Sequence, residues 1–274
     1  MKIAVVGSGI SGLSATYYLS KKHTVDLFEK EDHFGGHSHT IDILLDKKKV
    51  SIDIGFIVFN KLNYPNLINF FKENGVKIEK SNMSFSISVT GKNIEYCGKG
   101  ILGIFCNKLN LFNLNFLKMF FEILKFYKQN ENIQNFNANL TLGEYLKQQK
   151  LSKYFIQYHI IPMVAAIWSM PPYEANQMPV SFFIKFFQNH GLFKIKNRPQ
   201  WYTVSNRSRT YVNKILSKIS GEYFKNYQIK KIKRLSDGIQ LHYGDSNEFF
   251  KYEKVILATH ADQALSIMKT PPKR

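Results

Sequence analysis

The feature that most constrains this chain is a set of glycines directly behind a short apolar segment. Residues 2–19 read KIAVVGSGISGLSATYYL and contain the pattern Gly7-x-Gly9-x-x-Gly12. The apolar residues 3–6 predict a strand that is buried in a parallel sheet. The glycines therefore stand where this strand ends and the chain turns.

The next residues have the pattern of a helix and then of a second strand. Residues 13–22 carry apolar positions at helical spacing, and the segment TVDLFEK at 24–30 alternates and ends near Glu29. Strand, glycine loop, helix and strand within about thirty residues form the context of a Rossmann-type dinucleotide site. A glycine-rich turn without a ligand is the alternative, and it leaves Glu29 unexplained.

Each residue of this predicted dinucleotide site has a physical task. Gly7 permits the tight turn, Gly9 lets the backbone approach a pyrophosphate, and Gly12 lets the helix pack closely on the strand. The helix N-terminus, which includes Ser11, offers free N–H groups and a partial positive charge to phosphates. Glu29 is placed to accept hydrogen bonds from a ribose.

Composition indicates a packed globular chain with an excess of lysine. The 274 residues are 44% hydrophobic and 15% aromatic, which suits one large domain or two smaller ones. The net charge is +18, but 33 of the 38 basic residues are lysines scattered among Asn, Ile and Phe. We expect no dedicated nucleic-acid site. Attraction to an anionic membrane surface stays open as a partner interaction.

Sequence signals for export, membrane spanning and metal binding are missing. No apolar run approaches the roughly 20 residues that span a bilayer, and the N-terminus does not read as a signal peptide. Cys97 and Cys106 make no disulfide framework, and no Cys/His grouping has zinc spacing. We expect a cytoplasmic protein without a metal, with association at the inner membrane surface left open.

A second glycine pair narrows the choice of nucleotide. Gly35 and Gly36 lie in EDHFGGHSHT, six residues beyond Glu29. A GxGxxG pattern followed by an acid and then Gly-Gly resembles the FAD-binding amine-oxidase superfamily, which includes amine oxidases, protoporphyrinogen oxidases and phytoene desaturases. The resemblance implies FAD as the cofactor, with the Gly-Gly pair close to its diphosphate. His37 stands where that family often has Arg.

The resemblance assigns further cofactor-binding positions along the chain. It implies that Asp53 and Gly55 lie beside the isoalloxazine ring and that the backbone of Ile229 contacts the adenine. Residues 254–265, KVILATHADQAL, match the family strand that ends in Ala-Thr and packs against the dinucleotide, which implicates Thr259.

Longer motifs point to one subgroup of that superfamily. They are GFIVFN (55–60), AAIWSMPP (165–172), NHGL (189–192), RPQWYTV (198–204) and ATHADQAL (258–265). Together they resemble the predicted NAD/FAD-binding proteins that are often encoded near cyclopropane fatty-acid synthases. The resemblance leaves the activity of that subgroup undefined.

The fold that this resemblance implies is α/β: a Rossmann-like FAD-binding domain of the amine-oxidase type with an inserted α+β substrate or cap domain. We place the FAD-binding domain at residues 1–62 and 204–274 and the inserted domain at residues 63–203. Two departures stand out. Asn206-Arg207 replaces a Gly-Gly of the relatives, and the chain ends at SIMKTPPKR, before the family's final Gly-Asp segment. The expectation is a fragment, a split protein with a missing C-terminal half, or a frameshifted gene.

The middle of the chain departs from alternating strands and helices. Residues 84–98 predict a hairpin, and residues 109–130 and 180–193 predict amphipathic helices rich in Phe. The aromatic side chains form a core, line a tunnel for a long apolar substrate or lie on a bilayer. These phenylalanines are Phe120, Phe121, Phe182, Phe183 and Phe186.

The catalytic residues are unknown from the sequence. Tyr158, His159, His190 and His260 are candidates for a base by residue type only. The leading interpretation is an FAD-dependent oxidoreductase acting on a small, lipid-like molecule. The alternatives are a non-catalytic flavoprotein fragment or split subunit, and a peripheral membrane or interaction protein that keeps the Rossmann core as a scaffold.

Overall fold

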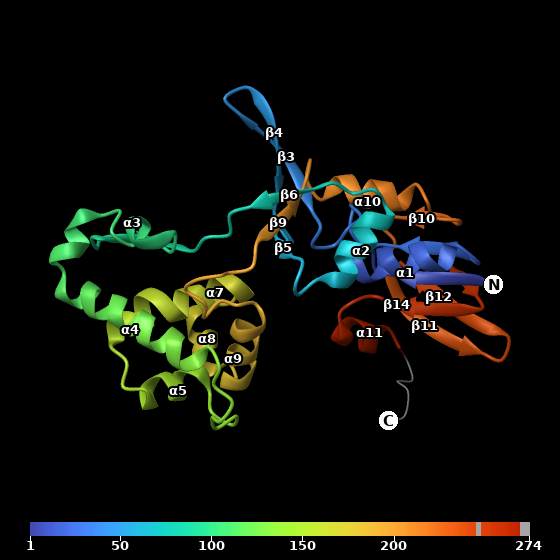
Figure 1. Cartoon of the computed structure of the whole chain (residues 1–274). Coiled ribbons are helices and arrows are strands. Elements are labelled where there is room, and N and C mark those ends of the chain that lie inside the picture. Colours follow the sequence, from blue (N-terminus) through green and yellow to red (C-terminus); the bar gives the residue numbers. More distant parts are fainter. Residues whose placement is uncertain (245–247, 269–274) are drawn as a thin grey trace. The chain divides into compact units, whose positions relative to one another are not determined.

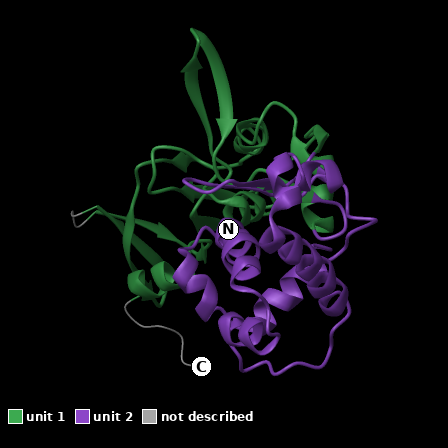
Figure 2. Cartoon of the chain, turned by 90° about the vertical axis from the view of Figure 1, so that its left-hand side faces the viewer, with its two compact units in different colours: residues 1–59, 64–81, 202–274 green, residues 60–63, 82–201 purple. Residues whose placement is uncertain are grey.

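The chain divides into two compact units, which Figures 1 and 2 show in a computed structural model describing residues 1–244 and 248–268. Unit 1 comprises residues 1–59, residues 64–81 and the segment that starts at residue 202, and unit 2 comprises residues 60–63 and 82–201. Residues 64–81, which the sequence analysis placed in the inserted domain, therefore belong to unit 1. The physical reason is that Phe70 and Phe71 are buried in the unit 1 core.

Unit 1 carries most of the strands. Its elements are β1 (Lys2–Val6), α1 (Ile10–Ser20), β2 (Thr24–Phe28), β3 (Thr40–Leu45), β4 (Lys48–Asp53), β5 (Phe59–Asn60), α2 (Pro65–Glu73), β6 (Ile78–Ser81), β9 (Trp201–Val204), α10 (Arg209–Leu216), β10 (Tyr223–Phe224), β11 (Ile229–Leu235), β12 (Gly238–Tyr243), β13 (Phe249–Tyr252), β14 (Lys254–Leu257) and α11 (Ala261–Ile267). β5 and β9 each extend one residue into unit 2.

Unit 2 is mainly helical. Its elements are β7 (Ser86–Val89), β8 (Ile94–Cys97), α3 (Gly100–Ile104), the 3-10 helix η1 (Lys108–Phe112), α4 (Leu114–Asn130), α5 (Leu142–Gln148), α6 (Lys153–Phe155), the π-helix η2 (Ile156–Ile160), α7 (Ile161–Trp168), α8 (Pro172–Gln177) and α9 (Val180–Asn189).

A parallel sheet in the order β10-β2-β1-β14 organises unit 1. β14 comes from the far end of the chain, yet Val6 of β1 pairs with Leu257 in it. At the carboxyl edge the Gly7 N–H donates to the Phe28 carbonyl at 2.8 Å, and the Ala258 N–H donates to the Val6 carbonyl at 2.8 Å. Three strand ends are thereby fixed around the glycine loop.

Strand β1 is buried on both faces, as its uninterrupted apolar sequence predicts. Ile3 and Val5 face a core that includes Leu13 of α1. Ala4 and Val6 face a second core with Ile229 and other residues of the antiparallel sheet β11-β12-β13. This confirms the predicted Rossmann-like α/β arrangement of the first residues.

The predicted elements of unit 2 are present with altered bounds. β7 and β8 pair as the expected hairpin. The expected helix at 109–130 is broken at Asn113, whose side chain accepts a hydrogen bond from the Phe116 N–H at 3.1 Å and so caps α4. The phenylalanines do not share one environment, because Phe183 is buried while Phe121 and Phe182 are 64% and 51% exposed.

Candidate functional site

A cavity of about 890 Å³ lies in unit 1 at the carboxyl ends of β1, β2 and β14. Its lining includes Gly7 after β1, Glu29 after β2 and Thr259 after β14. Parallel α/β sheets bind ligands at this edge. The volume is within the range of small-molecule and cofactor sites.

The glycines of the first loop differ in what surrounds them. Gly7 has φ +98°, and a Cβ there would lie 2.7 Å from the Ala258 carbonyl oxygen. A Cβ at Gly12 would lie 1.8 Å from the Gly7 carbonyl oxygen, so only glycine permits this helix-to-strand contact. A Cβ at Gly9 would meet no atom within 4 Å, although Gly9 lines the cavity. The open space at Gly9 is space that a ligand could occupy.

The first turn of α1 is arranged to receive an anion. The helix begins at Ile10 with Gly9 as its N-cap, and no side chain caps its N–H groups. The first turn contains no acidic residue, and Ser11 lines the cavity. Uncapped N–H groups and the positive end of the helix dipole favour a phosphate here.

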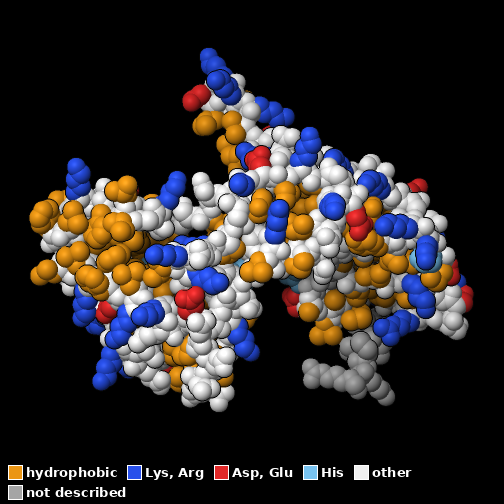
Figure 3. Space-filling view, in the orientation of Figure 1, with side chains coloured by type: hydrophobic (Ala, Val, Ile, Leu, Met, Phe, Trp, Pro, Cys, Tyr) orange, Lys and Arg blue, Asp and Glu red, His pale blue; other side chains and the backbone are white. Residues whose placement is uncertain are grey.

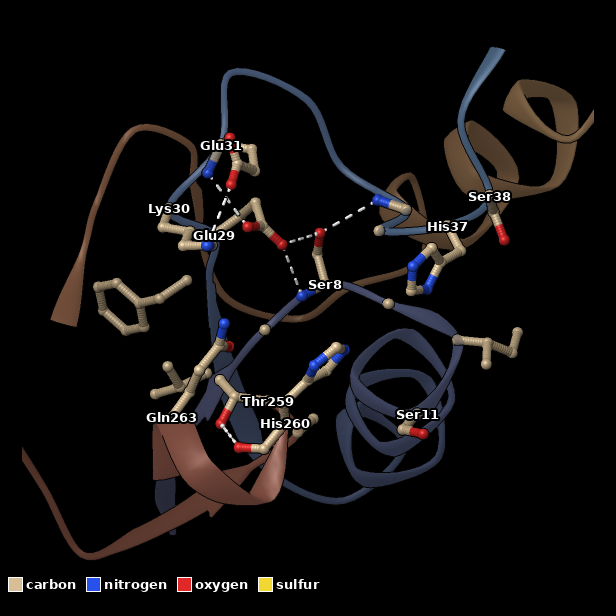
Figure 4. A pocket seen from close by; sticks show the side chains of 18 of the residues that line it. Ser8, Ser11, Glu29, Lys30, Glu31, His37, Ser38, Thr259, His260 and Gln263 are labelled. Atoms are coloured by element: carbon tan, nitrogen blue, oxygen red, sulfur yellow. Dashed lines mark hydrogen bonds and ion pairs between the residues drawn. The ribbon is translucent and has the colours of Figure 1, made fainter. Parts of the chain in front are cut away.

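Glu29 is buried and holds neighbouring backbone in place (Figure 4). Its Oε2 accepts hydrogen bonds from the Ser8 N–H at 2.9 Å and the Ser8 hydroxyl at 2.5 Å. Its Oε1 accepts one from the Glu31 N–H at 3.1 Å. A carboxylate offers about four acceptor positions. One position on Oε1 thus has no partner among these bonds and is available to a ribose hydroxyl.

The second glycine pair is tied to the first loop. The Gly35 N–H donates to the Ser8 hydroxyl oxygen at 3.0 Å, which extends the chain of bonds from Glu29 through Ser8 to Gly35. Gly35 and Gly36 have φ +115° and +56°. A Cβ at Gly36 would lie 3.0 Å from the Gly9 Cα. The pair therefore brings its backbone against the first glycine loop, and both glycines line the cavity.

Two histidines meet at the cavity. The ring centroids of His37 and His260 are 6.3 Å apart, and the angle between the ring planes is 25°. Both residues line the cavity (Figure 4). His39 instead stacks on His33 at 3.7 Å, and burial lowers the pKa of His39 below its usual value. Among the residues that the structure describes, no three His, Cys, Asp or Glu side chains group into a metal site.

Two predicted cofactor contacts are not part of the cavity. The Asp53 carboxylate accepts hydrogen bonds from the Ser208 N–H at 3.1 Å, the Ser208 hydroxyl at 2.8 Å and the Thr40 hydroxyl at 2.6 Å. A Cβ at Gly55 would lie 2.1 Å from the His37 carbonyl oxygen. Asp53 therefore fixes the start of α10 to β3, and the Gly55 backbone packs against the His37 carbonyl. Neither residue lines this cavity, and their position beside the isoalloxazine stays a prediction.

The other predicted positions lie at the cavity, and the structure adds some that the sequence analysis missed. Ile229 and Thr259 both line it. The missed lining residues include Ser8, Lys30 and Gln263. Ser8 could have been found, because its hydroxyl lies in the loop after β1 and Glu29 follows the neighbouring parallel strand β2. Nothing in the local pattern marks Gln263, which α11 brings to the cavity.

The Asn206-Arg207 pair keeps the backbone that glycines would adopt. Both residues have positive φ, 63° and 75°. Such angles are uncommon outside glycine and costly for a residue like Arg. The Arg207 Nε donates to the Ser51 carbonyl at 2.8 Å. That bond helps to hold the turn.

His159 lies in the interior of unit 2, between two tyrosines. Its Nδ1 is 3.0 Å from the Tyr96 hydroxyl and its Nε2 is 3.0 Å from the Tyr127 hydroxyl. The Tyr96 hydroxyl donates its one proton to the Tyr158 carbonyl at 2.7 Å, so Nδ1 is the donor to Tyr96 and Nε2 accepts from Tyr127. Burial, reinforced by Arg198, lowers the pKa of His159 to about 3. The imidazole is neutral and fully bonded, which suits a structural role.

The remaining candidates for a base lie in different units of the chain. The His190 Nδ1 bonds the Phe186 carbonyl at 2.9 Å, and the Tyr158 hydroxyl bonds the Lys92 ammonium. Both belong to unit 2. Only His260 of the four lines the unit 1 cavity.

Comparison with known proteins agrees with this geometry. Residues 5–73 match the family described as NAD(P)-binding Rossmann-like domain. Among solved structures, wild-type putrescine oxidase bound to putrescine is similar over 100% of this chain and 62% of its own, with a TM-score of 0.67 and 18% identity. The chain has the fold of putrescine oxidase. No curated protein matches it in sequence.

Two further solved structures have the same fold. A predicted protoporphyrinogen oxidase from Exiguobacterium sp. 255-15 is similar over 97% of this chain and 61% of its own, with a TM-score of 0.64 and 18% identity. A fatty acid isomerase from P. acnes that produces CLA is similar over 98% and 61%, with a TM-score of 0.56 and 13% identity. The chain thus spans about three fifths of the length of these proteins. At identities of 13–18%, the similarity establishes the fold alone.

Proposed function

We propose that the unit 1 cavity binds FAD and that the chain is an FAD-dependent oxidoreductase of the amine-oxidase type. The observation that carries this proposal is the chain of hydrogen bonds from Glu29 through Ser8 to Gly35. It joins the GxGxxG loop, the acid and the second glycine pair into one lining. An NAD-binding Rossmann unit does not need that second pair.

The residues of the cavity fit such a dinucleotide. Glu29 would hold the adenosine ribose, the first turn of α1 and the backbone of Gly9 and Gly36 would hold the diphosphate, and the Ile229 backbone would contact the adenine. When bound, a flavin accepts electrons from the substrate. The protein's own part is to bind and orient it. His37 and His260, which line the cavity, supply ring N–H groups for anionic oxygens.

For the substrate we propose a small, lipid-like molecule. One observation supports this class: a solved structure of this fold is a fatty acid isomerase.

The absorption spectrum and the released ligand of the purified protein test the cofactor. We expect flavin bands, and a heat-released nucleotide that co-elutes with FAD in chromatography. If the protein is colourless as purified, a calorimetric titration with FAD and with NAD decides which nucleotide the cavity prefers. Recovery of NAD alone, or binding of NAD but not FAD, would overturn the proposal.

A matched pair of variants locates the binding. Glu29→Ala removes the acid at the cavity, whereas Glu79→Ala removes an exposed acid of β6 in the same unit. Only Glu29→Ala should weaken FAD binding. Equal loss in both variants would show that the nucleotide is not held at this cavity.

A further inference from the structure

Unit 2 presents a concentrated set of exposed apolar side chains on α3, η1 and the first half of α4. Figure 3 shows hydrophobic side chains gathered over this part of the molecule. We call these seven residues the apolar patch, with their exposed fractions: Ile101 (71%), Leu102 (89%), Leu109 (59%), Leu111 (49%), Phe112 (84%), Leu114 (81%) and Phe121 (64%).

The patch is not explained by the packing of the unit. The same segment buries Phe116 and Met119 in the unit 2 core, so its inward face is already satisfied. A helix segment that is apolar on its outer face as well indicates a second apolar environment. None of the seven residues lines the unit 1 cavity or the smaller cavity around Glu131 and Lys194.

Lysines predominate around the patch. Residues 95–122 contain three exposed lysines, Lys99, Lys108 and Lys118, and an acid at each end, Glu95 and Glu122. Glu95 is exposed, whereas the Glu122 carboxylate accepts hydrogen bonds from the N–H and the hydroxyl of Ser152. Lysine stems can lie along an apolar surface while their ammonium groups reach outward. Large apolar side chains flanked by lysines are the composition of segments that lie in the interface of anionic bilayers.

We propose that the apolar patch docks on an anionic lipid bilayer, with its apolar side chains entering the interface and the three lysines contacting lipid phosphates and carboxylates. The proposal does not depend on the flavin chemistry of unit 1. Complementary charge favours a bilayer over an apolar protein groove, because the lysines around the patch outnumber the acids and the chain as a whole carries +18. Within the described residues, no helix is long and apolar enough to cross a membrane.

Sedimentation with vesicles tests the docking. The full chain should bind vesicles of phosphatidylcholine with phosphatidylserine, and bind pure phosphatidylcholine at least about tenfold more weakly. Replacing two of the most exposed residues, Leu102→Ser with Phe112→Ser, should lower binding to the anionic vesicles by roughly a hundredfold. Neutralising the three lysines to Gln should lower it at least about tenfold and remove most of its salt dependence.

Matched controls separate docking from general effects. Tyr173→Ser with Ile195→Ser removes two exposed apolar side chains of unit 2 outside the patch, which are 70% and 55% exposed. Lys128→Gln with Lys147→Gln and Lys185→Gln removes equal charge from exposed positions of the same unit. Both control variants should bind like the parent. Circular dichroism should show that all variants are folded, since no substituted side chain belongs to the buried core.

Cys106 gives a second readout that does not rely on variants of the patch. It is exposed and lies between Leu102 and Leu109 in the chain. In a Cys97→Ser background, an environment-sensitive dye on Cys106 should shift to the blue on anionic vesicles. Absence of vesicle binding, binding that the patch variant does not reduce, or self-association that the patch variant abolishes would each overturn the proposal.

Discussion

The Ser8 hydroxyl donates to the Glu29 carboxylate at 2.5 Å and accepts from the Gly35 N–H at 3.0 Å. One short side chain inside the glycine loop thus connects the end of β2 to the second glycine pair. Glu29 has two tasks, because the same carboxylate that is available to a ribose also fixes the loop next to the proposed diphosphate site.

Glu29→Ala should weaken FAD binding by about 1.5–3 kcal/mol, the scale of a hydrogen bond to a charged group. Glu29→Gln should cost less, since it keeps one acceptor oxygen, but its amide N–H₂ only donates, so the bond from either Ser8 or Glu31 is lost. Ser8→Ala should weaken binding by about 1 kcal/mol through the loop alone. Calorimetric titration measures all three. No loss for Glu29→Ala would place the ribose elsewhere.

Gly9→Ala and Gly12→Ala should separate binding from folding. A Cβ at Gly9 meets open space, so this variant should fold with an unchanged melting temperature and lose nucleotide affinity at least about tenfold. A Cβ at Gly12 would overlap the Gly7 carbonyl oxygen, so that variant should be destabilised by several kcal/mol, about 3 or more, or fail to fold. Thermal unfolding and FAD titration check both. Normal affinity in a folded Gly9→Ala protein would contradict the diphosphate position.

His37→Arg should strengthen FAD binding by about 1 kcal/mol. The position lines the cavity, and a guanidinium is charged at every working pH and can bond a phosphate through two N–H groups at once. His37→Ala should have the opposite effect. The matched control is His23→Arg, because His23 follows α1 and does not line the cavity. Equal gains in the two Arg variants would indicate general attraction of an anion to a basic protein.

Unit 2 should lose stability in acid through His159. The pKa of this buried imidazole is lowered from 6.5 to about 3, so the unfolded state binds more protons than the folded state between these values. The free energy of unfolding of unit 2 is therefore highest above pH 6.5. It falls as the pH drops toward 3, by up to about 1.4 kcal/mol per pH unit.

Tryptophan fluorescence can follow this loss in unit 2 alone, because the two tryptophans of the chain, Trp168 and Trp201, both belong to it. His159→Gln does not titrate and should flatten the pH dependence of the denaturant midpoint. His190→Gln is the matched control and should leave it unchanged. An unaltered slope in His159→Gln would show that another group governs the acid sensitivity.

Local features of unit 1 follow from the sequence, because each depends on neighbours in the chain. β1, the glycine turn, α1 and β2 could be predicted from apolar runs and glycine spacing, and so could the β11-β12 hairpin. The tight turn at Gly7 and the close contact between helix and strand at Gly12 are predicted for the same reason. Their backbone requirements are local to a strand-to-helix turn.

The tertiary structure decided the contacts between residues far apart in the chain. Asp53 bonds Ser208 rather than lining the cavity, and α2 packs into unit 1 although its sequence pattern suits any amphipathic helix. The pairing of β14 with β1 brings Thr259 and His260 to the glycine loop. The direction of the Phe side chains was likewise undetermined, because helical spacing marks an apolar face but does not say whether core, substrate or membrane covers it.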